Sequence, residues 1–204
     1  MSFDDSYLEV VGSSKGLFKD KGSKFIAYAY SVKSEEDVKQ RLAEVKKQEY
    51  AARHHCYAYI LNPDKSAQRD SDDGEPSNTA GKPILGQLLS RELTNTLVVV
   101  VRYFGGVKLG VSGLITAYRA AASEALEDIT VEKCFVKDVF TVYFKYPEMN
   151  NVMRMIKDNA LEIINQDFEL ECALTFCVKK SQSEKIQSIF ALNHLLTLEF
   201  IKTI

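Results

Sequence analysis

Three carboxylates lie close together in residues 71–76, at Asp72, Asp73 and Glu75. Carboxylates at this spacing could coordinate a hard cation such as Mg²⁺. They could also form an acid–base pair if burial raised the pKa of one of them. The Asp-Gly and Glu-Pro pairs of the same segment are typical of turns, however, so the simpler interpretation is a solvated turn whose Asp side chains accept backbone amides. Binding of a ligand or partner, and catalysis, stay open as alternatives.

A second group combines cations with glycines, because Arg102 and Lys108 flank Gly105 and Gly106, and Ser112 follows. Glycines that free backbone amides just before a helix, with cations and a hydroxyl nearby, could bind an anion. The spacing matches neither a Walker loop nor the dinucleotide-binding fingerprint. The simpler interpretation is a tight strand-to-helix turn that needs glycine for steric reasons.

The third candidate is the run Arg53, His54, His55 and Cys56. A Cys–His pair could supply a nucleophile and its base. Adjacent residues of a strand face opposite sides, however, so His55 is badly placed to serve Cys56. His54 shares the face of Cys56, but no residue that would orient its ring can be identified. A histidine that hydrogen-bonds the acidic segment is the simpler prediction.

Two predicted strands must position these residues. Residues 54–61 form a strand that sends His54 and Cys56 to the same face. Residues 96–103 are almost wholly apolar, as expected for a central strand that is covered on both faces. An alanine-rich helix is predicted to start at Ser112 and to follow the glycine turn.

The acidic segment falls in a polar stretch, residues 62–78, that is predicted to be one long loop. Loops of this length inside a compact domain are usually functional or mobile. Thr79 is a candidate cap for the helix that follows, which carries Lys82. If folding brings them near, Arg53, Lys82 and Arg119 could join the cations of the glycine turn.

The sequence predicts an α+β protein of two domains, residues 1–130 and 134–204. In the first, Ser34 and Asp37 have the spacing of a capping box and predict a helix that runs to about Gln48. In the second, strands and helices alternate as βαββαβ, the ferredoxin-like arrangement. These elements are predicted at residues 135–146, 148–158, 161–168, 171–178, 183–192 and 195–201. The second domain shows no catalytic constellation, so recognition or scaffolding is its default role.

The composition limits the classes of partner, with 46% apolar residues, 26% charged residues and a net charge of −2. Without an excess of Lys and Arg, nucleic-acid binding must come from a local patch. The longest aliphatic run, residues 97–101, is far shorter than the roughly 20 residues that span a membrane. The acidic N-terminus lacks a signal-peptide core, so a cytoplasmic protein is expected. No two of the 4 cysteines have the spacing of a zinc site, and neither a metal nor another cofactor is expected.

Four stretches of the first domain occur in a recognisable order. They are Arg-His-His-Cys-Tyr-Ala at 53–58, Ser-Asp-Asp-Gly-Glu-Pro-Ser at 71–77, Thr-Ala-Gly-Lys-Pro-Ile-Leu at 79–85 and Val-Arg-Tyr-Phe-Gly-Gly-Val-Lys-Leu-Gly at 101–110. Together they resemble the YigZ/IMPACT family, and the second domain resembles the ferredoxin-like appendage of its bacterial members. One departure is Asn78, where the family has glycine. Asn tolerates left-handed backbone better than most residues, so the turn is expected to survive.

The resemblance implies a first domain with a mixed β-sheet and helices on one face, a βαβ-type fold shared with a small-subunit ribosomal protein and elongation factor G. Eukaryotic members regulate translation by competing for the activator of a starvation-responsive kinase. They carry a different accessory domain, so that partnership does not transfer to this chain. For bacterial members, association with nucleic acid or the ribosome is the usual suggestion.

The leading hypothesis is a non-enzymatic regulatory protein of translation or stress that binds RNA, the ribosome or a translation factor through its first domain. The binding residues would be Arg53, His54, His55, Asp72, Asp73, Glu75, Lys82, Arg102, Gly105, Gly106, Lys108 and Ser112. The alternative is a metal-assisted hydrolase or phosphotransferase that uses the carboxylates of residues 72–75.

Overall fold

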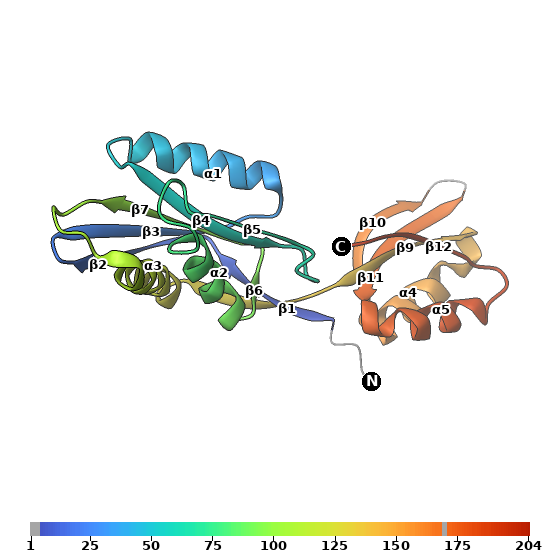
Figure 1. Cartoon of the computed structure of the whole chain (residues 1–204). Coiled ribbons are helices and arrows are strands. Elements are labelled where there is room, and N and C mark those ends of the chain that lie inside the picture. Colours follow the sequence, from blue (N-terminus) through green and yellow to red (C-terminus); the bar gives the residue numbers. More distant parts are fainter. Residues whose placement is uncertain (1–4, 169–170) are drawn as a thin grey trace. The chain divides into compact units, whose positions relative to one another are not determined.

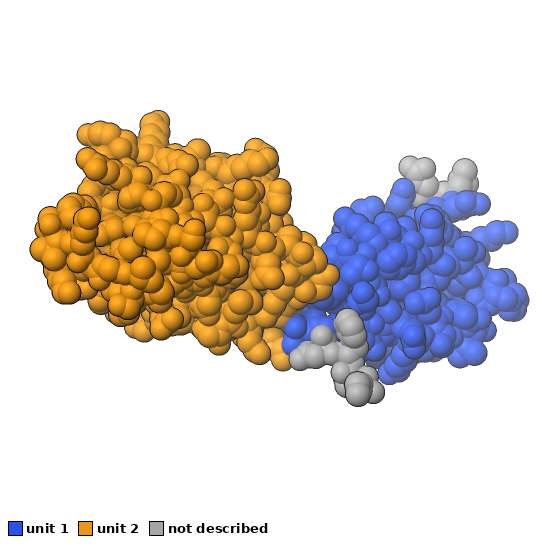
Figure 2. Space-filling view, in the orientation of Figure 1, with its two compact units in different colours: residues 1–6, 135–204 blue, residues 7–134 orange. Residues whose placement is uncertain are grey.

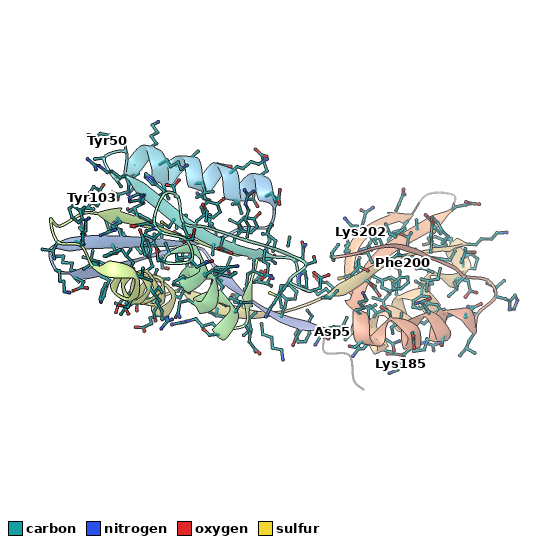
Figure 3. The ribbon with its side chains drawn as sticks, in the orientation of Figure 1. Asp5, Tyr50, Tyr103, Lys185, Phe200 and Lys202 are labelled. Atoms are coloured by element: carbon teal, nitrogen blue, oxygen red, sulfur yellow. The ribbon has the colours of Figure 1, made fainter. Side chains whose placement is uncertain are left out.

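The computed structural model describes residues 5–168 and 171–204, which form two compact units (Figure 2). One unit is Tyr7–Cys134, and the other combines Phe135–Ile204 with Met1–Ser6. Asp5, labelled in Figure 3, belongs to the second unit. Its carbonyl accepts the Val136 amide at 2.8 Å and its carboxylate accepts the Ser181 amide at 2.9 Å. The sequence alone does not indicate this attachment.

The first unit is built on a five-stranded sheet with the order β2-β3-β7-β4-β5. Its strands are β2 (Ser13–Asp20), β3 (Ser23–Ser31), β4 (His54–Leu61), β5 (Ala67–Ser71) and β7 (Thr96–Tyr103). A two-residue turn with positive φ at Lys21 and Gly22 joins β2 to β3, the geometry that a tight hairpin needs. Strand β7 lies at the centre, and its valines alternate between the apolar clusters of the two faces. The prediction of a central strand covered on both sides is therefore confirmed.

Helices cover both faces of this sheet (Figure 1). They are α1 (Glu35–Gln48) on one face, and α2 (Gly81–Ser90) and α3 (Gly110–Glu127) on the other. Helix α1 starts at the predicted capping box of Ser34 and Asp37, and it buries Val38 and Val45 against the sheet. The α+β class is confirmed. The expected mixed sheet with helices on one face is wrong in both details, because every pairing in this sheet is antiparallel and both faces of β7 are apolar and need cover.

A small second sheet completes the first unit, with the order β6-β1-β8. Its strands are β1 (Ser6–Val11), β6 (Leu93–Thr94) and β8 (Thr130–Phe135), and β1 pairs with β6 in parallel. The polar stretch 62–78 is not one loop, because β5 occupies its middle and pairs with β4 as an edge strand. The side chains of β5 are polar on both faces, so no apolar alternation marks it in the sequence.

The second unit has the element order βαββαβ and the sheet order β10-β11-β9-β12, which confirms the ferredoxin-like prediction. Its elements are β9 (Lys137–Phe144), α4 (Met149–Asp158), β10 (Glu162–Phe168), β11 (Cys172–Lys179), α5 (Ser183–Ala191) and β12 (Thr197–Thr203), with 3₁₀ turns at Tyr146–Glu148 and Lys180–Gln182. Helices α4 and α5 share one apolar cluster with one face of the sheet. Across residues 5–168 and 171–204, none of the helices is long and apolar enough to cross a membrane.

Candidate functional site

The acidic segment and the end of β7 meet in a buried ion pair. Arg102 Nη1 lies 2.7 Å from Oε1 and 3.0 Å from Oε2 of Glu75, and the two side chains are 9% and 4% exposed. The Tyr118 hydroxyl of α3 donates to the same Glu75 carboxylate at 2.8 Å. The two segments singled out in the sequence therefore converge, but the charge of Arg102 is neutralised inside the protein.

Asp72 holds the start of α2. Its carboxylate accepts the backbone amides of Asn78, Ala80 and Gly81 at 2.8–2.9 Å. Burial by itself would raise the pKa of Asp72, but these three amide donors outweigh it and lower the pKa below its ordinary value. Thr79 does not cap the helix as predicted. Its hydroxyl donates to the Pro76 carbonyl, and α2 begins two residues later with Asp72 in the capping role.

Asp73 is hydrogen-bonded to both histidines, and each hydrogen bond joins a side chain to a backbone group. The His55 amide donates to Asp73 Oδ2 at 2.7 Å, and His54 Nδ1 lies 2.8 Å from the Asp73 carbonyl. The second carboxylate of the segment is thus occupied by an amide donor at the start of β4. Asn78 has φ of 63°, so it adopts the left-handed conformation that Asn tolerates better than most residues.

The three carboxylates do not converge on a common point. Asp72 takes the amides of α2, Asp73 takes the His55 amide, and Glu75 takes Arg102 and Tyr118. Among the described residues, no group of three or more His, Cys, Asp or Glu side chains has the arrangement of a metal site. The acidic segment is a turn whose carboxylates bind the start of α2, the start of β4 and Arg102.

Cys56 is buried behind this turn. Its side chain is fully enclosed, and Sγ donates to the Asp72 carbonyl at 2.9 Å. Burial raises the pKa of the Cys56 thiol, which disfavours the thiolate that a nucleophile needs. The geometry gives Cys56 a structural role.

The glycine turn serves close packing. A Cβ on Gly105 would lie 1.9 Å from the Gly22 backbone, and the Gly105 amide donates to Ser23 Oγ at 3.1 Å. This amide is therefore turned toward the β2–β3 hairpin, whereas Lys108 and Ser112 are exposed. Helix α3 begins two residues before the predicted Ser112, at Gly110.

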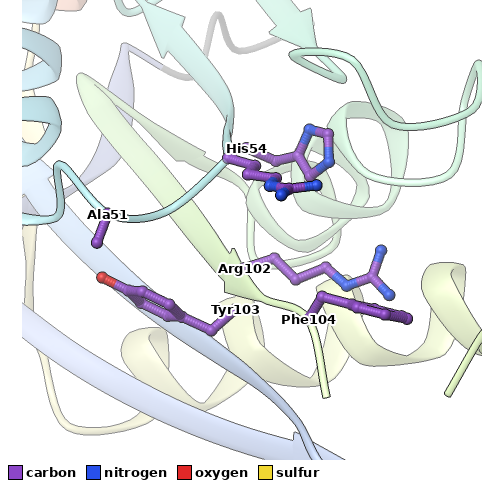
Figure 4. Close-up of a pocket in the computed structure, with 6 residues that line it drawn as sticks. Ala51, His54, Arg102, Tyr103 and Phe104 are labelled. Carbon is purple, nitrogen blue, oxygen red and sulfur yellow. The ribbon is translucent and has the colours of Figure 1, made fainter. Parts of the chain in front are cut away.

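A pocket of about 400 Å³ opens where β4 begins and β7 ends (Figure 4). It is lined by Ala51, Arg53, His54, Arg102, Tyr103 and Phe104. The Arg102 guanidinium lies 5.6 Å from the centre of the Phe104 ring, and Arg102 Nε is buried with no hydrogen-bond partner among the residues that the structure describes. Figure 4 shows Tyr103 extending toward Ala51, on the other side of the strand from Arg102. The predicted residues Arg53, His54 and Arg102 are brought together here.

A second hollow, of about 380 Å³, lies along α2 and α3. We call it the α2–α3 groove, and it is lined by Asn78, Lys82, Pro83, Gly86, Gln87, Ser90, Ile115 and Arg119. Lys82 Nζ lies 2.9 Å from Asp70 Oδ1, and its side chain is 57% exposed. Arg119 is exposed. This groove gathers two of the cations that the sequence suggested as additional contacts.

Two aromatic features escape the sequence reasoning. Tyr118 anchors Glu75 from inside α3, and nothing in the apolar pattern of that helix indicates a polar partner. Around Glu49, at the end of α1, Tyr28 and Tyr103 both donate to the carboxylate. The hydrogen bond to Glu49, together with burial, raises the pKa of Tyr103 to about 12. Figure 3 labels Tyr103 near Tyr50, which lies in the turn after α1.

Comparisons with known proteins place the chain among relatives with the same domain. Residues 21–126 match the model of the "Impact N-terminal domain". The chain is 41% identical to "IMPACT family member YvyE" of Bacillus subtilis over 62% of this chain and 58% of that protein. It is 35% identical to an "IMPACT family member" of Haemophilus influenzae over 88% of this chain and 89% of that protein.

The same similarity extends to three dimensions. A solved structure described as "Crystal structure of an hypothetical protein" is 29% identical to this chain with a TM-score of 0.71. It covers 97% of this chain and 98% of that one, so both units have counterparts in it. Since the domain model matches more than half of the residues and the H. influenzae relative aligns over most of both sequences, this chain belongs to the IMPACT family.

Proposed function

We propose that this chain is a non-enzymatic regulator of translation that binds RNA through its first unit. The translation part of the proposal follows from membership of the IMPACT family. The RNA part depends on local charge, because a net charge of −2 gives no general attraction to phosphate.

The single observation that carries the proposal is the α2–α3 groove. Lys82 and Arg119 line one hollow together with the amides and hydroxyl of Asn78, Gln87 and Ser90. Cationic, amide and hydroxyl side chains are the groups with which proteins contact the phosphates and sugars of nucleic acids. The Ser90 hydroxyl donates to the Gln87 carbonyl, so the hollow presents cations and side-chain amides as donors to the backbone of an RNA strand.

The neighbouring acids offer little opposition to a phosphate backbone. Asp72, Asp73 and Glu75 are each occupied by donors within the protein. Among the described residues, the ion pair to Asp70 is the only one recorded for Lys82, and Arg119 has none. Arg119 therefore remains free to meet an external anion, and Lys82 would meet one in exchange for its contact with Asp70.

The test is filter binding of ribosomal RNA fragments at several salt concentrations, with co-sedimentation on ribosomes beside it. In the double variant Lys82→Ala and Arg119→Ala, loss of two phosphate contacts should flatten the slope of log K against log salt by about 1.4, at about 0.7 per contact for single strands. The matched control is Lys46→Ala with Lys47→Ala, which removes two exposed cations from α1 on the opposite face of the sheet. Equal slopes for the groove variant and the control would refute the proposal.

A translation factor as the direct partner is a second candidate. Val107 and Val111 are 51% and 60% exposed beside the glycine turn, and paired apolar side chains of this kind suit a protein interface. A pull-down from a lysate with and without nuclease separates the two candidates. Ribosomal material that stays bound after nuclease digestion, and is lost with Val107→Ser plus Val111→Ser, would favour the protein partner.

A further inference from the structure

The pocket at the ends of β4 and β7 contains a donor that the protein leaves unused. Arg102 Nη1 is occupied by Glu75, but Nε is enclosed and has no acceptor among the described residues. Buried polar groups of native proteins almost always have a partner, and an orphaned one calls for an explanation. This donor lies beside the pocket, because Arg102 is one of the residues that line it.

The other polar groups of the pocket have the same preference. Arg53 is exposed at the mouth of the pocket and brings a second guanidinium. His54 Nδ1 must carry the proton that it shares with the Asp73 carbonyl, because a carbonyl can only accept. His54 Nε2 is then left available, as an acceptor in the neutral ring and as a donor in the charged one. The charge of Arg102 is paired with Glu75, whereas Arg53 has no ion pair among the described residues, so Arg53 favours an anionic ligand and His54 offers it a further hydrogen-bonding group.

The exposed aromatic ring of the pocket favours a ligand that contains a planar ring. Phe104 is 59% exposed, and its ring lies beside the Arg102 guanidinium. Exposed aromatic rings and guanidinium planes are the surfaces on which proteins stack unpaired bases. A volume of about 400 Å³ is within the range of small-molecule sites.

We propose that this pocket binds one nucleoside monophosphate unit, with the phosphate at Arg53 and Arg102 and the base on Phe104. The unit could be the phosphorylated end of an RNA strand or a free nucleotide. The inference goes beyond the proposed function, because the pocket shares no residue with the α2–α3 groove.

The test is calorimetric titration of the full chain with adenosine 5′-monophosphate, uridine 5′-monophosphate, adenosine and inorganic phosphate. Both monophosphates should bind at least about 10-fold more tightly than adenosine or phosphate alone, because neither half of the ligand fills the whole pocket. Phe104→Ala should weaken both about 10-fold, a typical effect of removing one stacking partner, and Phe104→Tyr should restore them. Arg53→Ala should weaken the monophosphates and leave adenosine unaffected.

Lys24→Ala is the matched control, since it removes an exposed cation that lies opposite Tyr103 on the neighbouring strand and does not line the pocket. Binding of inorganic phosphate as tight as that of the monophosphates would overturn the proposal. Unchanged affinity in both Phe104→Ala and Arg53→Ala would also overturn it, as would the absence of binding at millimolar concentration.

Two further arms identify the source of the ligand. A five-residue RNA with a 5′-phosphate is compared with the same RNA carrying a 5′-hydroxyl, both in the wild-type chain and in the Lys82→Ala, Arg119→Ala variant. A preference for the phosphorylated RNA that survives in the groove variant indicates a strand end. Monophosphate binding without such a preference indicates a free nucleotide. If the chain binds monophosphate but no RNA, the proposed function fails and the pocket assignment stands.

Discussion

At the scale of single residues, Arg102 and Glu75 form a buried ion pair whose role is structural. The residues of the site that can contact a ligand are the exposed ones. Both side chains of the pair are almost fully enclosed, and Tyr118 adds a third member to the network. Substituting Arg102 would therefore report on folding before it reported on binding. Exposed residues such as Arg53, Lys82 and Lys108 are the better probes of function.

The first prediction concerns this pair. Arg102→Ala should lower the free energy of unfolding by about 3–5 kcal/mol, because it leaves the Glu75 carboxylate buried without its cation. Arg102→Met combined with Glu75→Gln should recover most of that loss, since Gln keeps an acceptor for Tyr118 and no charge remains buried. Urea unfolding measures both. A double variant as unstable as the single one would show that the charge of Glu75 is not the cause.

The second prediction concerns Asp72 and pH. Its pKa in the folded protein is lower than the ordinary 3.8, so its contribution to stability is complete well above pH 3.8 and is lost as the pH falls through the folded pKa. Asp72→Asn should be less stable than the wild type at pH 7, and the difference should shrink below pH 3.8. Urea midpoints between pH 2.5 and 7 test this. A difference that stays constant over that range would mean that the carboxylate charge plays no part.

At the scale of elements, the third prediction concerns the contact between the glycine turn and the β2–β3 hairpin. Gly105→Ala should lower the free energy of unfolding of the first unit by about 1–3 kcal/mol, because the added Cβ would lie 1.9 Å from the Gly22 backbone. Gly86→Ala is the matched control. Its Cβ meets nothing within 4 Å, and alanine should stabilise α2 by up to about 1 kcal/mol. Thermal unfolding of both variants gives the comparison, and equal melting temperatures would contradict the packing argument.

The sequence predicts an element well where apolar periodicity and local chemistry agree. The capping box of Ser34 and Asp37 marks the start of α1, and the valines of β7 mark a central strand. The sequence does not predict strand β5, because an edge strand made mostly of polar residues shows no apolar alternation. The start of α2 is misplaced because its cap, Asp72, lies nine residues before Gly81, and only the tertiary fold brings a side chain that far back to the helix.

The same limit applies to the site. The spacing of residues in the sequence identifies Arg102, Glu75 and His54 as candidates, and the structure places them together at one end of the sheet. Spacing cannot tell which charges face inward. The pairing of Arg102 with Glu75 and the orphaned Nε follow from β7 and the acidic turn meeting over Tyr118, a residue with no signal of its own.

At the scale of the whole molecule, each unit has its own apolar core, so the two can be perturbed separately. The fourth prediction uses Asp5, whose carboxylate accepts the Ser181 amide in a buried position. Asp5→Ala should cost about 1–3 kcal/mol, because it removes the hydrogen bond between the Ser181 amide and a charged acceptor. Hydrogen exchange followed by mass spectrometry should show faster exchange in Phe135–Ile204 and unchanged exchange in Tyr7–Cys134. Faster exchange spread evenly over both units would contradict this assignment.

The attachment of Asp5 makes the first unit an insertion within the second. Asp5 lies in the second unit, the chain leaves that unit at β1 and returns to it after β8, and these two strands are hydrogen-bonded neighbours in one sheet. An inserted domain whose two ends lie side by side can be removed or exchanged as a cassette. Joining Ser6 to Phe135 through a short linker should therefore leave a ferredoxin-like protein that folds alone, and the same junction is a natural place for another domain to be received.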